Sequence, residues 1–317
     1  MRTIDYRITG AEAGWTVERF LKSRGVSQRV IIALKKLPDG MLQNGSHTRT
    51  VDLLREGDTL QVNLPQPVKR IPLCDIPVPI LYEDEDVIVY NKPADMPCHQ
   101  SGGHIYGTLD GVYAAHCART GLPAPFRPIN RLDKDTTGVV VAARNQLAAG
   151  KLWKAVEKRY IAVMEGTPSP EEGIVDLPME REVPMEPRRV VTPDGQRAVT
   201  CYRVLGTGGG RSVAAFRLLT GRTHQIRVHM SYKGWPLVGD GLYGRPSPDI
   251  PRQALHCAWA AFPHPITGAR VEVTAPLPPD FRSLIECSGI PWEEPDWRNL
   301  FSQSGLDACC AGREIIL

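Results

Sequence analysis

The chain has 317 residues, of which 42% are hydrophobic and 23% are charged, a composition that is ordinary for a soluble globular protein. This length is enough for a full hydrophobic core and for more than one domain. No apolar run reaches the roughly 18 residues that a membrane helix needs, and the N-terminus lacks the apolar core of a signal peptide, so we expect a cytoplasmic protein without a membrane partner.

Cysteine and histidine spacing gives no sign of a metal site. Eight cysteines are scattered along the chain without a Cys-x-x-Cys pair, so we expect reduced thiols rather than a zinc ribbon. His224 and His229 are five residues apart, which is not the spacing of the His-Glu-x-x-His motif. The net charge of +3 permits a nucleic-acid partner without demanding one.

Residues 1–64 form the first predicted domain. Apolar residues recur at helical spacing in two short segments, the first ended by Gly25 and the second N-capped by Ser27. Asn44-Gly45 then predicts a tight turn between short strands. Up to Pro65 the segment carries ten Lys/Arg against seven Asp/Glu, which equals the net charge of the whole chain. The cations that we place on the polar faces of the helices are Lys22, Arg24, Arg29, Lys35 and Lys36.

A proline-rich stretch without periodicity, residues 65–79, is typical of a linker. The second predicted domain covers residues 80–290 and opens with strand-like runs at 80–82 and 87–90. After a strand in "GVVVAARN", Asn145 is expected to cap a helix over "QLAAGKLWKAVEKR", with Val156 on its apolar face, and "YIAVMEG" is expected to be a strand.

Residues 174–219 are expected to form several strands, with turns at Pro193-Asp194-Gly195 and Gly208-Gly209-Gly210. A helix over "HQIRVHMSYKG" should end at Gly234. Strands outnumber helices and do not alternate with them, which favours an α+β domain whose mixed, mainly antiparallel sheet is flanked by helices and loops. Residues 291–317 form a C-terminal tail that matches no pattern we can interpret.

Three segments carry candidate chemistry. "RPINRLDKDTTG" (127–138) places Asp133 beside Arg131 and Lys134, although Asp and Thr are ordinary turn residues and Asp133 could simply cap a turn. "EKRYIAVMEG" places Tyr160 at the start of a strand. "LLTGRTHQIR" leads from a strand through a glycine loop into a helix that begins near Thr223 and holds Arg227 in its first turns.

Together these segments resemble the RluA-type pseudouridine synthase family. Its patterns His-Arg-Leu-Asp-x-x-Thr-Ser-Gly, Lys-x-Tyr-x-Ala and Gly-Arg-x-His-Gln-Ile-Arg correspond here to residues 130–138, 158–162 and 221–227. Asn130 and Thr137 stand where the family usually has His and Ser, and we expect them to change local hydrogen bonds but not the reaction. The N-terminal helices and hairpin resemble the S-four type RNA-binding module; a small helical cap with solvated lysines is the alternative.

The resemblance implies an RNA uridine isomerase that flips its target base and needs no cofactor. It assigns the essential carboxylate to Asp133 and its ionic partner to Arg227, because a nearby cation opposes the cost of desolvating a charge. It assigns to Tyr160 a ring that stacks on uracil. The Tyr160 hydroxyl is also a candidate base for the proton on carbon 5, provided that a cation lowers its pKa.

The resemblance also suggests residues that contact RNA. We hypothesise that Arg131 fills the gap left by the extruded uridine, the alternative being a surface salt bridge to Asp133 or Asp135. Ile226 could wall the uracil pocket or belong to the core. Further candidates orient the loop or touch RNA: Arg222, His224 and Gln225. Three arginines offer phosphate contacts or are solvated surface: Arg181, Arg188 and Arg189.

Several alternatives remain open. An inactive RNA-binding protein of the same fold is the first, and a carbohydrate-acting enzyme that uses Asp133 and Asp135 is the second. We expect Asp135 instead to be an acceptor that stabilises the loop. Ribosomal RNA is the expected substrate and transfer RNA the alternative. We expect a monomer because no unexplained apolar heptad is present.

Overall fold

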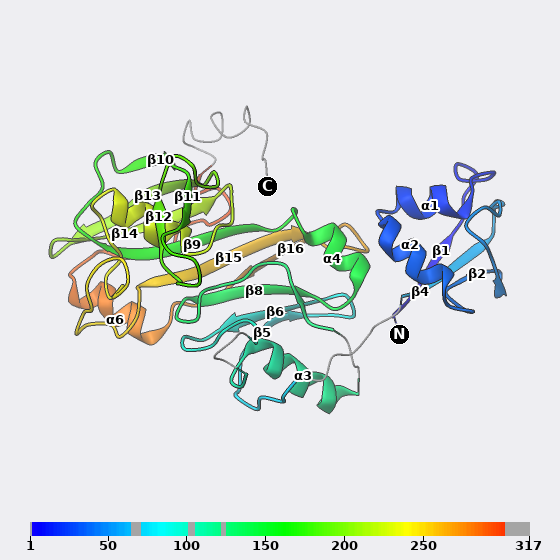
Figure 1. Ribbon diagram of the computed structural model, residues 1–317, viewed down its shortest axis with the longest axis horizontal. Helices are drawn as coiled ribbons and strands as arrows, with labels where there is room; N and C mark the ends of the chain where they lie inside the picture. The colour runs from blue at the N-terminus through cyan, green and yellow to red at the C-terminus, as the bar shows by residue number, and fades with distance from the viewer. Residues whose placement is uncertain (1, 65–70, 101–104, 122–124, 302–317) are drawn as a thin grey trace.

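The computed structural model describes residues 2–64, 71–100, 105–121 and 125–301, and it has an α+β fold (Figure 1). A small N-terminal module lies beside one end of a larger sheet domain. The larger domain contains a ten-stranded sheet, so the predicted fold class is confirmed.

The N-terminal module has two helices on a four-stranded antiparallel sheet of order β1-β4-β2-β3. Thr16 caps the first helix through its side chain, and Gly25, with φ +78°, follows the helix end as predicted. Ser27 occupies the N-cap of the second helix without a side-chain hydrogen bond. The elements are β1 (Arg2–Arg7), α1 (Val17–Ser23), α2 (Gln28–Lys35), β2 (Met41–Gln43), β3 (Ser46–His47) and β4 (Thr59–Leu64).

The sheet of the larger domain has the order β10-β13-β14-β9-β15-β8-β6-β5, with β16 paired to β15 and β7 to β8. Along the described residues its ladders are antiparallel except for β8 with β15. Its strands are β5 (Ile80–Glu83), β6 (Val87–Lys92), β7 (Arg127–Pro128), β8 (Thr137–Ala143), β9 (Glu157–Glu165), β10 (Glu172–Asp176), β13 (Val199–Gly208), β14 (Arg211–Leu218), β15 (Leu255–Pro263) and β16 (Arg270–Thr274).

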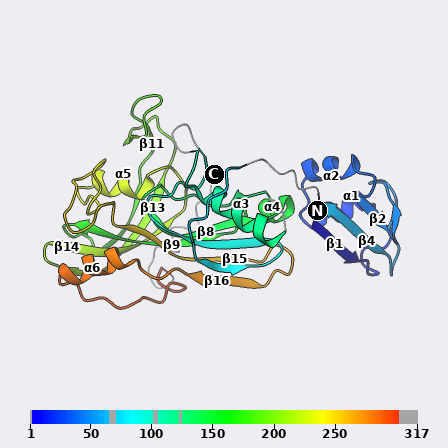
Figure 2. The ribbon, with the colours of Figure 1, turned by 90° about the horizontal axis from the view of Figure 1, so that it is seen from below.

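Both faces of this sheet are covered. Figure 2 shows α3 (Leu109–Thr120) and α5 (Gln225–Tyr232) on one side and α6 (Pro279–Cys287) on the other. Strand β9 alternates accordingly: Tyr160 and Ala162 belong to the core cluster that also holds Ile226, whereas Ile161 packs in the second cluster with Phe281. The period of two along one buried strand thus directs Tyr160 to the face that carries α5.

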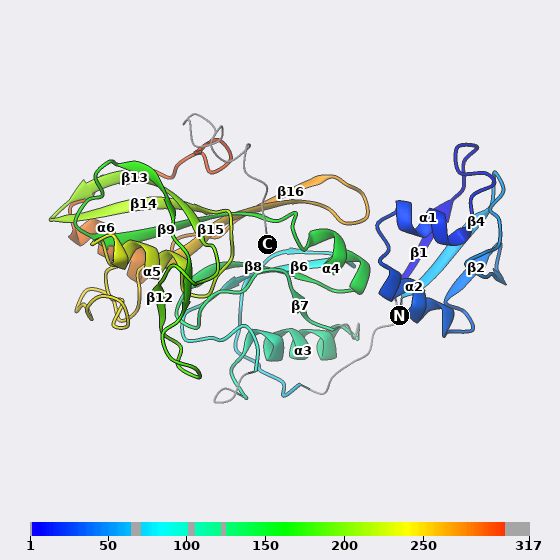
Figure 3. The same cartoon turned by 45° about the horizontal axis from the view of Figure 1, so that its top comes forward.

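A two-stranded hairpin, β11 (Met179–Arg181) with β12 (Arg189–Val191), stands outside the main sheet. Figure 3 shows β12 beside α5, and the two elements are in contact. The hairpin therefore lies next to the helix that carries Arg227.

The helix expected after Asn145 is shorter than predicted. Asn145 does cap it, because its Oδ1 accepts the Ala148 N–H at 2.8 Å, but α4 (Gln146–Leu152) ends before Val156. The residues that follow belong to strand β9, since Glu157 already pairs with Ala261 of β15. Six further elements were not predicted from the sequence: β1, α3, β7, β15, β16 and α6.

The described residues contain neither a disulfide nor a helix that could span a membrane. Six cysteines lie in the described part of the chain and none of them forms a disulfide there, whereas Cys309 and Cys310 lie outside it. Among the described helices, none has both the length and the apolar character needed to cross a membrane.

His256 on β15 supports the parallel junction with β8. The ring is fully buried; its Nδ1 lies 2.8 Å from Thr137 Oγ1 and its Nε2 3.1 Å from the Ala275 carbonyl oxygen. A carbonyl only accepts, so Nε2 carries the proton and Nδ1 accepts from the Thr137 hydroxyl. Thr137 thus uses its hydroxyl for this structural bond, and Asn130 likewise bonds to Val139 and Val141 of β8.

We predict an acid-sensitive fold that depends on His256. Burial lowers the pKa of His256 from its ordinary 6.5 to about 4. Between these values the unfolded chain binds the proton and the folded chain does not. The free energy of unfolding should therefore fall as pH decreases from 6.5 to 4, by about 3 kcal/mol from this group. Urea unfolding of wild type and His256→Gln across this range measures the effect, and parallel pH profiles for the two proteins would contradict it.

Candidate active site

Asp133 lies in the loop between β7 and β8, and backbone bonds fix this loop. The Thr136 N–H donates to the Asp133 carbonyl at 3.1 Å, which closes a turn before β8 begins. Gly138 follows with φ +109°, and a Cβ there would lie 2.2 Å from the Cys257 carbonyl oxygen. The Thr-Thr-Gly turn therefore requires glycine at its end so that β8 can approach β15.

Lys92 supports the same loop from the core. Its side chain is fully buried, and Nζ donates to the carbonyl oxygens of Pro93, Met96 and Lys134, each at 2.8 Å. Burial lowers the pKa of Lys92 to about 8. Three acceptors match the three N–H groups of an ammonium, so the charged form suits this position at neutral pH. Lys92 thereby holds the carbonyl that directly follows Asp133 along the chain.

Arg227 of α5 lies between two carboxylates. Its Nη1 donates to Asp133 Oδ2 at 3.1 Å, which is the contact expected from the sequence. Its Nε and Nη2 donate to Asp240 Oδ2 and Oδ1 at 2.7 and 2.9 Å. The Asp240 side chain has no exposed surface, and these carboxylates raise the pKa of Arg227 against the opposing effect of burial. The bidentate pair with Asp240 fixes the guanidinium and directs Nη1 at Asp133.

His224 approaches the same carboxylate from the N-cap of α5. Its Nε2 lies 3.8 Å from Asp133 Oδ2 and its Nδ1 lies 2.8 Å from the Tyr243 hydroxyl. That hydroxyl accepts the Arg189 N–H at 2.8 Å, so its own proton is available to His224 Nδ1. Burial lowers the pKa of His224, which favours the neutral ring with its proton on Nε2, facing Asp133.

Tyr160 is buried on β9, and its phenol lies against the Cys257 thiol. Burial raises the pKa of Tyr160 well above its ordinary value, and the Cys257 and Asp133 groups raise it further. The phenol is therefore neutral in the free protein. The groups that contribute most to this pKa include no cation that would lower it, which is the condition for Tyr160 to act as a base.

Three other charged residues lie in the loop that carries Asp133, and each has different contacts: Arg131, Lys134 and Asp135. Arg131 is exposed, and among the described residues it has no ion pair, so the predicted salt-bridge alternative is absent there. Lys134 pairs with Asp95 at 2.6 Å. The backbone carbonyl of Asp135 accepts from Arg252 Nη1 at 3.3 Å, whereas no described residue donates to its carboxylate. Asp135 thus acts as an acceptor in the loop through its backbone carbonyl.

For Gln225 and Ile226 the structure shows the structural role that the sequence had left open beside contact with RNA or uracil. Gln225 is 2% exposed; its Oε1 accepts from Thr220 Oγ1 and the Arg222 N–H, and its Nε2 donates to the Val199 carbonyl. All of these bonds hold the glycine loop on β13, so Gln225 has no free group to offer to RNA. Ile226 is 3% exposed and packs in the core cluster with Tyr160. The Arg222 side chain is half-buried and donates to the Arg197 carbonyl.

The cations that were predicted to contact RNA lie on the N-terminal module and on the β11–β12 hairpin. Four module cations are exposed as expected: Lys22, Arg29, Lys35 and Lys36. Of these, Lys22 pairs with Glu18 at 2.8 Å. Arg24 is half-buried, pairs with Glu12 at 2.6 Å and stacks on Phe20. On the β11–β12 hairpin, Arg181 and Arg188 are exposed, while Arg189 is half-buried and contacts Tyr243 through its backbone.

Sequence reasoning missed three residues of this site: Lys92, Asp240 and Tyr243. The signal available for Asp240 was an acid between two glycines in "LVGDGLYG", a few residues after the end of the helix that carries Arg227. A carboxylate that follows a glycine turn can fold back on the preceding helix. Neither Lys92 nor Tyr243 carries a local signal that separates it from an ordinary strand or loop residue.

Comparisons with known proteins fit this geometry. The family described as RNA pseudouridylate synthase matches residues 86–232, a span that contains Asp133, Tyr160 and Arg227. The uncharacterized RNA pseudouridine synthase YjbO of Bacillus subtilis is 40% identical over 86% of this chain and 98% of its own length. The ribosomal large subunit pseudouridine synthase D of Zymomonas mobilis is 36% identical over 90% of this chain and 98% of its own.

Solved structures show the same fold. The structure titled human RNA pseudouridylate synthase domain containing 1 aligns with a TM-score of 0.55 at 27% identity, over 71% of this chain and 94% of that one. Its counterpart, domain containing 4, aligns with a TM-score of 0.57 at 24% identity, over 68% and 94%. Both alignments leave part of this chain uncovered.

Proposed function

The chain belongs to the RNA pseudouridine synthase family and is an isomerase that acts on RNA, and from this premise we propose that Asp133 is its catalytic carboxylate. The observation that carries the proposal is the ion pair in which Arg227, itself fixed by Asp240, holds Asp133 Oδ2. An inactive RNA-binding protein would have no need of a buried arginine directed at a partly exposed acid.

The two oxygens of Asp133 have different surroundings. Arg227 and His224 both face Oδ2, and no described residue donates a hydrogen bond to Oδ1. We propose that Oδ1 is the atom that acts on the substrate, at the anomeric carbon, on the uracil ring or in glycal formation. The reaction breaks the bond from C1′ to N1 and forms the bond from C1′ to C5. The C5 proton is lost, N1 gains a proton, and the carboxylate is regenerated.

We propose that Tyr160 acts through its ring. The side chain lies on the sheet face that carries α5, in the same core cluster as Leu132 and Ile226, and the nearby charge of Asp133 contributes to raising the pKa of its phenol. A flat neutral ring beside the carboxylate can stack on uracil once the base is extruded. The neutral hydroxyl can donate a hydrogen bond to the base, which does not require phenolate.

Arg131 is proposed to occupy the place of the extruded uridine. We expect Arg131→Ala to lower kcat/KM on a base-paired target by about 10- to 100-fold, because unstacking a base costs a few kcal/mol that the guanidinium would otherwise offset. On a single-stranded RNA with the same uridine the loss should be small. Tritium release from both RNAs measures this, with Lys134→Ala as the matched loop cation. Equal losses on the two RNAs would argue against the role.

The proposed substrate is large-subunit ribosomal RNA, supported by the relatives named ribosomal large subunit pseudouridine synthase D. The exposed cations of α1 and α2 support an RNA-binding role for residues 1–64. The test is tritium release from transcripts labelled at uracil carbon 5, using large-subunit ribosomal RNA and, separately, transfer RNA. We expect release from the ribosomal transcript; release from transfer RNA alone would reassign the substrate, and release from neither would favour a binding protein.

The domain boundaries are proposed with one change at each end of the catalytic domain. Residues 1–64 form the module. The segment 65–79 was predicted as a linker, but Cys74 and Val78 pack against the core of the catalytic domain and the Cys74 N–H donates to the Gly111 carbonyl, so we start that domain at Cys74. Trp297 and Phe301 belong to the second core cluster, and the Leu300 carbonyl accepts from Arg203, so we extend the domain from 290 to 301. The role of the remaining tail falls outside the described residues. A cytoplasmic location and a monomeric state also stay predictions.

A further inference from the structure

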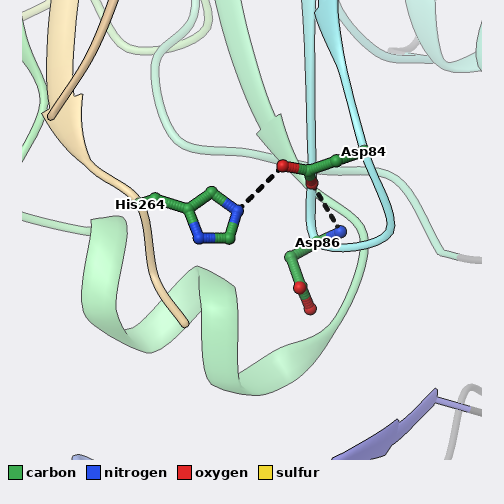
Figure 4. Close-up of side chains that lie close together, drawn as sticks. All are labelled: Asp84, Asp86 and His264. Atoms are coloured by element: carbon green, nitrogen blue, oxygen red, sulfur yellow. Dashed lines mark hydrogen bonds and ion pairs between the residues drawn. The ribbon is translucent and has the colours of Figure 1, made fainter. Parts of the chain in front are cut away.

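A cluster of acids and histidine lies at the turn between β5 and β6, next to the module (Figure 4). Asp84, Asp86 and His264 place possible ligand atoms within 4.8 Å of one another. Both carboxylate oxygens of Asp84 already have hydrogen-bond partners. Its Oδ2 lies 2.8 Å from His264 Nε2, and its Oδ1 accepts the Asp86 and Val87 N–H groups. In Figure 4 the Asp86 carboxylate points away from this pair.

Asp86 is directed instead at the first strand of the module. Arg2 of β1 donates from Nε to Asp86 Oδ1 at 3.1 Å and from Nη2 to Oδ2 at 3.0 Å, while its Nη1 lies 2.8 Å from Glu85. Asn145 Nδ2 also donates a hydrogen bond to Asp86 Oδ1, at 2.6 Å. The Asp86 side chain is only 4% exposed, so the forked pair with Arg2 is a largely desolvated contact between the two domains.

An apolar contact lies beside this ion pair. Leu147 of α4 is 2% exposed and belongs to the core cluster of the module, with Ile266 of the β15–β16 turn packed against the same cluster. Lys151 of α4 comes so close to Gly25 that a Cβ at Gly25 would lie 3.0 Å from its Cε, and its Nζ donates to the Pro265 carbonyl. The term module contact is used below for the following residues: Arg2, Gly25, Asp86, Leu147, Lys151 and Ile266.

We propose that the module contact fixes the N-terminal module on the catalytic domain and thereby helps to determine which uridine reaches Asp133. The inference rests on the proposed RNA-binding role of the module. A short linker keeps the two surfaces at high effective concentration, so a small contact suffices to keep them docked. Figure 2 shows α2 and α5 on the same side of the molecule, so docking holds α2 on the side of the catalytic helix.

The full-length protein provides the test, through two disrupting variants and one control. Arg2→Glu places an acid against Glu85 and Asp86, and Leu147→Ser removes the apolar contact from the other domain. Arg7→Glu makes the same charge change on the same strand at an exposed position without an ion pair among the described residues, so it reports the loss of general phosphate attraction. The probe is a large-subunit ribosomal RNA transcript labelled with tritium at uracil carbon 5, beside a short stem-loop that holds the same uridine.

We expect Arg2→Glu and Leu147→Ser each to lower kcat/KM on the long transcript by about tenfold more than Arg7→Glu does. Turnover at saturating RNA and the rate on the short stem-loop should be unchanged. Nitrogen-15 relaxation should show a single tumbling time for both domains of the wild type and two in the variants. Two tumbling times in the wild type, or equal losses in all three variants, would overturn the proposal. A wild type that tumbles as one body but releases no tritium from any RNA would instead refute the proposed function.

Discussion

Asp133→Asn is expected to lower tritium release from uracil carbon 5 by about four orders of magnitude or more while leaving the fold intact. The amide has the shape of the carboxylate and can still accept from Arg227 Nη1, so the loop keeps its geometry. Arg227 also keeps its bidentate pair with Asp240. What is lost is the negative charge, and with it any attack on C1′ or on the ring. Single-turnover tritium release and a thermal melt of the variant measure the two parts of this prediction.

Asp135→Asn is the matched control. It makes the same chemical change two residues away in the same loop, at a carboxylate to which no described residue donates, and it leaves the carbonyl that accepts from Arg252 in place. We expect its rate to stay within a few-fold of wild type. A large loss in Asp135→Asn together with a small one in Asp133→Asn would move the catalytic assignment from one acid to the other. A similar large loss in both would point to a paired-carboxylate mechanism.

The sequence anticipated features that depend on short-range signals. Helical spacing, Gly25 and the Asn44-Gly45 turn located the module helices and hairpin, because each signal acts within a few residues. Ordered motifs, read through the family resemblance, brought Asp133 and Arg227 together although they are 94 positions apart. Spacing alone would not have paired them, because it describes one face of one element and not its partner.

The features that the sequence did not anticipate depend on tertiary partners. Strand β1 is defined by its pairing with β4, from Arg2↔Leu64 to Arg7↔Thr59, and α4 is cut short by the pairing of β9 with β15. Lys92 reads locally as the polar end of a strand, and only the folded loop supplies its three carbonyl acceptors. Gln225 shows the same limit: the sequence left open whether it orients the loop or touches RNA, and only the folded loop shows that its side-chain bonds are internal.

Arg227→Leu is expected to destabilise the protein by about 3–5 kcal/mol and to slow the reaction by about 100- to 1,000-fold. The substitution leaves two carboxylates near one another without their cation, and that of Asp240 is fully buried. Asp133 also loses the donor that holds Oδ2 and orients Oδ1. Urea unfolding measures the first effect, and single-turnover tritium release at a temperature where the variant is folded measures the second.

The double variant Arg227→Leu/Asp240→Asn separates stability from catalysis. Removing the Asp240 charge removes the unpaired buried ion, while the amide oxygen can still accept the Leu242 and Tyr243 N–H groups that Asp240 Oδ1 now accepts. We therefore expect the double variant to regain about 2 kcal/mol or more relative to Arg227→Leu, because an uncompensated buried charge accounts for most of the loss. The rate should not recover, because Asp133 still has no cation. If activity returned together with stability, Arg227 would be a structural residue that acts only through the fold, and the ion pair with Asp133 would have no part in the chemistry.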